Sequence, residues 1–358
     1  MNKPKKELQI LHSIPMHDNK FNEMQKLLFK DYCNHYVGCL SEEKDISCFD
    51  LIVLQFLRTE DADFLLNHEI TTPVIWFCWG GDLFSLGRFH NMFLLPKTKK
   101  LSKDLSYKRS LTGKLKMMMK SVAPLLADRR KDSIKIIKAF SCIDYMIPVV
   151  PGDYNFLVKN YNVGKMKSAH INLINPLVNK DDFPEITGRN ILLGNSASFT
   201  NNHLEAIDWL KNRDLSGRKV IIPLSYGKSD LADHVSLYAT ECLGKENVKV
   251  LRNFMAYDEY NILINSCEIV VMNHLRQQAM GNIVQALLNG SHIYLREEST
   301  IYQFLIENKF IISSLNKANN LVGLDKDDVL FNRQKAKKIF GAEYQRWKLD
   351  TLIENIVS

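Results

Sequence analysis

Short apolar runs alternate along this chain with stretches whose apolar residues recur at helical spacing. The apolar runs lie at residues 8–12, 49–54, 73–78, 139–150, 170–173, 190–193, 219–224, 248–251, 268–273 and 292–296. Helical spacing is clearest at residues 21–30, 201–211, 228–243 and 257–266. Strands that alternate with helices predict βαβ units and mainly parallel sheets. The expected fold class is therefore α/β.

The alternating series is interrupted once, at residues 175–189. This stretch is rich in residues that favour loops, namely Pro176, Asp181, Asp182, Pro184 and Gly188. A chain of 358 residues exceeds the usual size of one hydrophobic core. The sequence thus predicts a Rossmann-like domain at residues 1–180, a second at residues 188–335, and a C-terminal helix at residues 336–358.

Composition narrows the class of protein. The chain is 46% hydrophobic and 24% charged, as in ordinary globular proteins. Its seven cysteines are scattered without a C-x-x-C pair, which argues against a disulfide framework or a zinc knuckle. No H-x-x-x-H or D-x-D pattern suggests a metal cage, so we expect no metal and no cofactor. We find no eighteen-residue apolar run and no signal peptide, and we expect a cytoplasmic protein.

The first half of the chain contains a basic stretch at residues 97–131. It holds twelve Lys or Arg against two Asp, interleaved with Leu and Met. The pattern indicates one or two basic amphipathic helices. They fit a solvated helix pair that covers the sheet, or a face attracted to an anionic membrane surface. Nucleic-acid binding is disfavoured, because the stretch is poor in aromatic residues and no nucleic-acid motif accompanies it.

The richest chemistry lies at residues 276–290, between two apolar runs. Arg276, Gln277 and Gln278 precede Gly281 and Asn282, and a helix pattern ends at Gly290. A polar loop that opens a helix at the carboxyl end of a strand is a typical anion site. Arg276 is suited to a charge-assisted contact with a diphosphate. A surface arginine before a helix cap is the alternative.

Two further loops follow strands of the second half. Gly194, Asn195 and Ser196 lie between a strand and a helix and could contact phosphate or sugar hydroxyls, although a simple tight turn fits equally well. Glu297 follows the last strand. Its carboxylate could accept from sugar hydroxyls, or it could belong to a solvated charge pair.

In the first half, a buried run leads directly into Trp79-Gly80-Gly81-Asp82. Asp82 is suited to act as a general base on an acceptor hydroxyl, or to orient it. A helix N-cap is the competing interpretation. His17 follows the first strand and could face the same place, although a lone histidine is more often structural.

These segments resemble one known family. The residues W-F-C-W-G-G-D-L-F-S-L from Trp76, I-L-L-G-N-S-A-S-F-T-N-N-H-L-E-A-I from Ile191, and the stretch 276–290 are similar to the TDP-N-acetylfucosamine:lipid II N-acetylfucosaminyltransferases, glycosyltransferase family 56. Pro15, His17 and Pro223-x-x-Tyr226 fit the same pattern. Gly81 departs from it, because the family has alanine there.

The resemblance implies a GT-B architecture, with two Rossmann-like domains facing across a cleft and the last helix packing back on the first domain. It implies transfer of a 4-acetamido-4,6-dideoxygalactose (fucose-type) sugar from dTDP to a polyprenyl-diphosphate-linked saccharide. The enzyme would lie on the cytoplasmic face of the bacterial inner membrane, with residues 97–131 against its surface. The alternatives are a different nucleotide sugar, or a non-catalytic protein that binds nucleotide sugar or anionic lipid.

Specific roles follow from this resemblance. Asp82 and Arg276 are the expected catalytic residues. The acceptor is assigned to His17, Gly80, Gly81 and Asp82. The donor is assigned to Gly194, Asn195, Ser196, Tyr226, Arg276, Gln277, Gln278, Gly281, Asn282 and Glu297.

Overall fold

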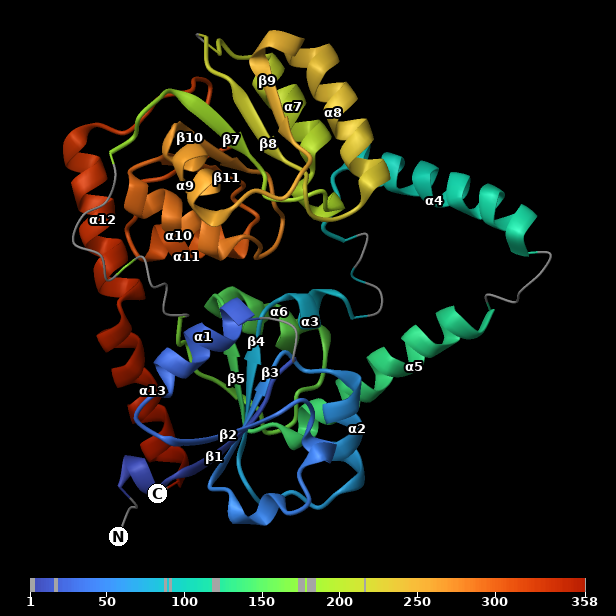
Figure 1. The fold of residues 1–358 in the computed structure, drawn as a ribbon, viewed down its shortest axis with the longest axis vertical. Helices are drawn as coiled ribbons and strands as arrows, with labels where there is room; N and C mark the ends of the chain where they lie inside the picture. Colours follow the sequence, from blue (N-terminus) through green and yellow to red (C-terminus); the bar gives the residue numbers. More distant parts are fainter. Residues whose placement is uncertain are drawn as a thin grey trace. The chain divides into compact units, whose positions relative to one another are not determined.

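The chain folds into two compact units in a computed structural model (Figure 1). The structure describes residues 4–15, 19–86, 89, 92–117, 123–172, 178, 185–215 and 217–357. Unit 1 comprises residues 1–90, 122–179 and 338–358, and unit 2 comprises residues 91–121 and 180–337. Most of the predicted linker at residues 175–189 lies outside the described residues. Each unit is built on one sheet.

The sheet of unit 1 has six parallel strands in the order β2-β1-β3-β4-β5-β6. The strands are β1 Gln9–Ser13, β2 Cys33–Val37, β3 Leu51–Gln55, β4 Val74–Cys78, β5 Tyr145–Pro148 and β6 Lys167–Ser168. The chain reverses its direction across the sheet between β1 and β3. In such sheets the crevice at the carboxyl ends of the two diverging strands is a common ligand site.

Helices pack on the sheet of unit 1 through alternate strand residues. They are α1 Asn19–Leu28, α2 Thr59–Asn67, α3 Gly81–Phe84, α5 Ala123–Ala139, α6 Pro151–Asn160 and α13 Ala342–Val357. Ile10, Val53 and Phe77 share one buried cluster with Leu349 and Ile353 of α13. The C-terminal helix therefore completes the core of unit 1, where Tyr32 also donates to Asp350 at 2.6 Å.

The sheet of unit 2 also has six parallel strands, in the order β12-β11-β10-β7-β8-β9. The strands are β7 Asn190–Leu193, β8 Val220–Pro223, β9 Val248–Leu251, β10 Cys267–Met272, β11 His292–Leu295 and β12 Ser313–Ser314. The first three strands progress to one side of β7 and the last three to the other. This is the Rossmann order, and its switch point lies between β7 and β10.

Helices line both faces of this second sheet (Figure 1). They are α7 His203–Lys211, α8 Ser229–Leu243, α9 Tyr257–Asn265, α10 Met280–Asn289 and α11 Thr300–Glu307. The helix α4 Pro96–Met117 contacts α7 and extends away from the sheet, and α12 Lys326–Phe340 ends in unit 1. One core cluster joins α7 and α8 to Ile191, Ile269 and Val271. Figure 1 shows α9, α10 and α11 along the opposite face.

The basic stretch is divided between the units. The sequence placed residues 97–131 in the N-terminal domain, whereas α4 belongs to unit 2 and α5 to unit 1. The reason is that Leu101 and Leu105 of α4 pack into the core of unit 2. Thr98 also donates to the carboxylate of Glu205 on α7, through its N–H at 2.9 Å and its hydroxyl at 2.6 Å.

Several local predictions need correction. The alternation at residues 139–150 yields a strand only at β5, because Phe140–Cys142 forms a 3-10 turn after α5. The run at residues 170–173 is not a strand over its described part. The edge strand β6 pairs earlier, at Lys167–Ser168. Two edge strands, β2 and β12, were not predicted.

Candidate functional site

Three loops of unit 2 follow β7, β10 and β11 at the carboxyl edge of the sheet. The first carries Gly194, Asn195 and Ser196, the second runs from Asn273 to Ala279, and the third begins at Arg296. Since β7 and β10 are hydrogen-bonded neighbours, the first two loops start side by side at the switch point. The fold therefore brings together the two segments that the sequence assigned to the donor.

Side chains cross-link these two loops. Gln278 donates through Nε2 to Asn195 Oδ1 at 2.9 Å. Its Oε1 accepts from the hydroxyl of Thr200, which follows the first loop. The structure thus joins Asn195 and Gln278, two predicted donor residues, through direct contact.

Arg276 lies half-buried in the same group. Its guanidinium donates to the carbonyl of Gln277 at 2.6 Å and to Thr200 Oγ1 at 3.5 Å. The neighbouring Gln277 is 5% exposed, and its Oε1 has no hydrogen-bond partner among the described residues. A fixed cation and a buried unpartnered amide oxygen beside the turn form a polar centre suited to a ligand that carries both charge and hydroxyl groups.

The N-terminus of α10 opens beside this centre. Ala279, its N-cap, has a left-handed backbone with φ of 59°, and no side chain caps the helix. The first turn contains no acidic residue. A Cβ built on Gly281 meets nothing within 4 Å. The amides of this turn therefore have the positive field and the open space that an anion requires.

A buried polar layer, formed by Asn201, Asn202, Asn273 and His274, is hydrogen-bonded to these loops. It was not predicted from the sequence. Asn201 Oδ1 accepts from Asn195 N–H at 3.2 Å and pairs with His274 Nε2 at 2.8 Å. Its Nδ2 donates to the carbonyl of Ser196 at 2.8 Å. Asn202 Nδ2 donates to the carbonyl of Asn273 at 3.2 Å.

This layer continues to the third loop and to α4. Asn273 Oδ1 accepts from Arg296 Nε at 2.6 Å, and Asn202 Oδ1 accepts from Leu95 N–H at 2.8 Å, just before α4. A polar residue after a strand is the only sequence signal for Asn273 and His274. The same signal marks ordinary turns, which is why it was not decisive.

The side chains of three other predicted donor residues are placed as follows. The side chain of Tyr226, after β8, is 81% exposed. Asn282 donates to the hydroxyl of Tyr260 at 3.4 Å. Glu297 forms an ion pair with Lys317 at 2.7 Å, and this hydrogen bond lowers the pKa of its carboxyl. The donor roles of these three residues stay predictions.

In unit 1, Asp82 is buried, with 2% of its surface exposed. Its Oδ2 accepts from Trp76 Nε1–H at 2.7 Å and from Leu57 N–H at 3.2 Å. Cys78 Sγ donates to Oδ1 at 3.5 Å. Burial raises the pKa of Asp82 to about 6. These contacts show that Asp82 holds the loops after β3 and β4, and its role as base or acceptor-orienting group stays a prediction.

The two glycines before Asp82 meet separate constraints. Gly80 is the N-cap of α3 with φ of 86°, a backbone region that favours glycine. A Cβ on Gly81 would lie 3.0 Å from the ring of Phe56, a tight contact that favours glycine at this position. His17, the remaining predicted acceptor residue, lies outside the described residues.

Among the described residues, no three His, Cys, Asp or Glu side chains gather as metal ligands. Over the same part of the chain, no helix combines the length and apolar character needed to cross a bilayer.

Comparison with solved structures defines the fold. The fold is similar to sucrose-phosphate synthase from Thermosynechococcus elongatus, with a TM-score of 0.56 and 9% identity over 86% of this chain and 74% of that chain. It is also similar to the N-terminal domain of Candida albicans trehalose-6-phosphate phosphatase, with a TM-score of 0.54 and 12% identity over 100% and 98% of the chains. The two parallel sheets and these neighbours define the GT-B glycosyltransferase fold.

The family follows from the sequence of the second half. The model of the 4-alpha-L-fucosyltransferase family, glycosyl transferase group 56, matches residues 154–344, more than half of the chain. The protein belongs to this family and is a glycosyltransferase that takes a nucleotide-sugar donor and a saccharide acceptor.

Proposed function

We propose that this enzyme transfers a 4-acetamido-4,6-dideoxygalactose (fucose-type) sugar from a dTDP carrier to a polyprenyl-diphosphate-linked saccharide in bacterial surface polysaccharide synthesis. Membership of the fucosyltransferase family supports the sugar class. One observation carries the placement of the donor. Three features lie at the switch point of unit 2. They are the uncapped N-terminus of α10, Arg276, and the turn formed by Gly194, Asn195 and Ser196, called the Gly194 turn below.

In this proposal, the departing nucleoside diphosphate binds the amides of α10 and the guanidinium of Arg276. Negative charge grows on the leaving diphosphate in the transition state, so fixed donors lower the barrier most at that point. The reaction as proposed places this charge on protein groups without a metal ion. Asn195, Ser196 and Gln278 would contact phosphate or sugar hydroxyls.

The role of Arg276 can be tested by turnover. Replacing Arg276 with Ala removes a charge-assisted contact to the diphosphate, and we expect kcat/KM to fall at least a hundredfold, about 3 kcal/mol in the barrier. The melting temperature should stay close to that of the wild type. Arg189 is a matched control, because it is 64% exposed at the other end of β7. Equal activity of Arg276→Ala and Arg189→Ala would exclude Arg276 from the site.

The nucleotide can be identified by thermal shift with dTDP, UDP and GDP. The proposal expects dTDP to stabilise the protein more than the other two. A larger shift with UDP or GDP would replace dTDP by another donor. A transfer assay with an extract of lipid-linked acceptors then tests the polyprenyl linkage, because an acceptor stripped of its lipid should react more slowly.

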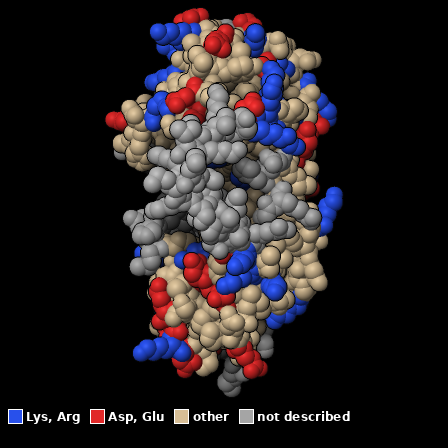
Figure 2. Space-filling model, turned by 90° about the vertical axis from the view of Figure 1, so that its right-hand side faces the viewer, with Lys and Arg blue, Asp and Glu red and all other residues tan. Residues whose placement is uncertain are grey.

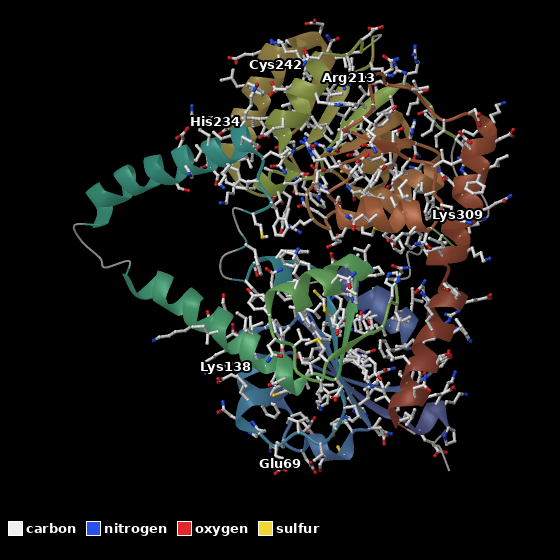
Figure 3. The ribbon with its side chains drawn as sticks, turned by 180° about the vertical axis from the view of Figure 1, so that it is seen from behind. Glu69, Lys138, Arg213, His234, Cys242 and Lys309 are labelled. Carbon is white, nitrogen blue, oxygen red and sulfur yellow. The ribbon has the colours of Figure 1, made fainter. Side chains whose placement is uncertain are left out.

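We further propose that the enzyme sits on the cytoplasmic face of the inner membrane, with the basic stretch 97–131 against anionic lipid. Lys99, Lys100 and Lys103 are exposed on α4, opposite the buried Leu105. Unit 1 has an exposed lysine of its own shortly after this stretch, Lys138 on α5, which is labelled in Figure 3. On the face shown in Figure 2, the described residues interleave both signs of charge, so binding would depend on local lysines rather than on the net charge.

Co-sedimentation with phosphatidylglycerol vesicles tests this contact. Replacing Lys99, Lys100 and Lys103 with Ala should reduce the bound fraction, since each lysine near an anionic surface contributes about 1 kcal/mol. The control removes three exposed lysines elsewhere in unit 2, Lys211, Lys245 and Lys249. Equal binding by both triple variants would contradict the proposed membrane face.

A further inference from the structure

The side chain of Asn201 bonds two residues of the Gly194 turn, Asn195 and Ser196. The Asn201 amide accepts from Asn195 N–H at 3.2 Å and donates to the carbonyl of Ser196 at 2.8 Å. The same amide oxygen pairs with His274 Nε2 at 2.8 Å. Because His274 follows β10 and the turn follows β7, these bonds link the two strands that diverge at the switch point.

The geometry fixes the proton of His274. Asn201 Nδ2 is used as a donor, so its Oδ1 is the acceptor, and His274 must carry its hydrogen on Nε2. Burial, reinforced by the charge of Arg276, lowers the pKa of His274 to about 3. The imidazole is therefore neutral at physiological pH and serves as a fixed donor.

The layer beneath the turn is tightly packed. Gly194 has φ of 68°, and a Cβ there would lie 2.7 Å from His203 Nε2 and 2.9 Å from Asn201 Oδ1. Within the part of the chain that the structure describes, His203 Nε2 and His274 Nδ1 are buried without a hydrogen-bond partner. Unpartnered buried nitrogens destabilise a fold. The layer therefore keeps two buried ring nitrogens unpaired, at a cost in stability, while His274 Nε2 holds the Asn201 amide directly beside the turn.

We propose that Asn201 and His274 are positioning residues for the donor diphosphate. They form one brace, the Asn201–His274 brace, which sets the Gly194 turn relative to the N-terminus of α10. The inference rests on the proposed function, in which the turn and α10 hold the donor. The brace touches neither donor nor acceptor, and acts by keeping the turn in its binding geometry.

The test measures dTDP affinity by calorimetry, together with donor and acceptor KM. Replacing His274 with Ala should weaken dTDP binding about tenfold, equivalent to 1.4 kcal/mol, and raise the donor KM in parallel. The acceptor KM should not change. His274→Gln should recover most of the affinity, because glutamine Nε2 is as many bonds from Cβ as imidazole Nε2 and can donate to Asn201.

Two further variants keep the test decisive. Asn201→Ala should resemble His274→Ala, and the double variant should lose no more than either single one, since each breaks the same brace. His292→Gln is the matched control, because this histidine is also buried, at the start of β11, where it bonds Val322 and Ser313. It should leave dTDP affinity unchanged.

The failures of the two proposals can be told apart. If the wild type binds none of dTDP, UDP and GDP, or if Arg276→Ala binds the nucleotide equally well, the proposed donor site is wrong and the brace has no function. If Arg276→Ala loses affinity but His274→Ala stays within twofold of the wild type, the donor site stands and the brace is refuted. Multiplicative losses in the double variant would likewise refute a single brace.

Discussion

At the residue scale, Gly194 combines a backbone constraint with a steric one. Its φ of 68° favours glycine, and its Cα faces the buried His203 ring and the Asn201 amide. Any side chain there would push on the layer that holds Asn195 and Ser196. Gly217 has a similar φ of 72°, yet a Cβ there meets nothing within 4 Å. Substitutions at Gly194 and Gly217 can therefore separate the cost of backbone strain from the cost of steric crowding.

Replacing Gly194 with Ala should destabilise the fold by about 2–3 kcal/mol, because backbone strain and a clash with a buried ring add together. The dTDP affinity should fall as well. Gly217→Ala should lose only about 1 kcal/mol, the backbone contribution alone. Urea unfolding of both variants measures this difference. Equal losses would show that the Gly194 turn tolerates a side chain.

Asp82 makes a prediction about pH. Burial raises its pKa from 3.8 to about 6, so between these values the folded state holds a proton that the unfolded state has lost. Stability from this group is therefore full below about pH 4 and falls as the pH rises through 6, by about 3 kcal/mol. Urea unfolding of the wild type and of Asp82→Asn from pH 4 to 7 isolates the contribution of Asp82 to stability. A stability difference that is constant with pH would contradict this behaviour.

The sequence could identify residues that directly follow a strand and open a helix, such as Gly194 and Gln278, because loop position and residue type are local signals. It could not identify Asn201 or His274 as partners. The bond between them joins residues 73 positions apart, and polar residues at the start of a helix look the same whether they cap it or support a neighbouring loop.

At the element scale, contacts with α7 stabilise the N-terminus of α4. The carboxylate of Glu205 on α7 accepts from the N–H and hydroxyl of Thr98 in the first turn of α4. Lys97 pairs with Asp208 on the same helix at 2.5 Å, and this bond raises the pKa of Lys97. The basic stretch was predicted from its composition, but its place in unit 2 depends on these contacts between distant segments.

Replacing Glu205 with Ala should therefore weaken the start of α4. We expect a loss of about 1–2 kcal/mol in the free energy of unfolding, as for other helix caps that satisfy backbone donors. Glu241→Ala, at an exposed position on α8, is the control and should change stability by less than about 0.5 kcal/mol. Comparable losses in both variants would mean that Glu205 does not cap α4.

The strands show where periodicity suffices. Fully buried strands such as β3 and β4 read as continuous apolar runs and were predicted within a residue or two. The edge strand β2 was missed because it is only half-buried and carries Asn34 and His35. The edge strand β12 has two residues, Ser313 and Ser314. Its pairing with β11 is set by the tertiary fold rather than by its own pattern.

At the scale of the whole molecule, two six-stranded parallel sheets follow from two series of alternating strands and helices. The order of the strands does not follow from this alternation, and it is the order that puts the switch point between β7 and β10. The chain also passes between the two units more than once, because residues 91–121 belong to unit 2 and residues 338–358 belong to unit 1. Apolar faces of helices indicate burial but do not identify the sheet that they cover.

The central claim is that the switch point of unit 2 holds the nucleoside diphosphate of the donor. Hydrogen-exchange mass spectrometry of the full chain with and without dTDP tests it most directly. We predict slower exchange in peptides covering residues 194–202 and 273–283, and no such protection in Arg276→Ala at the same dTDP concentration. Protection confined to other segments, or equal protection in Arg276→Ala, would contradict the account.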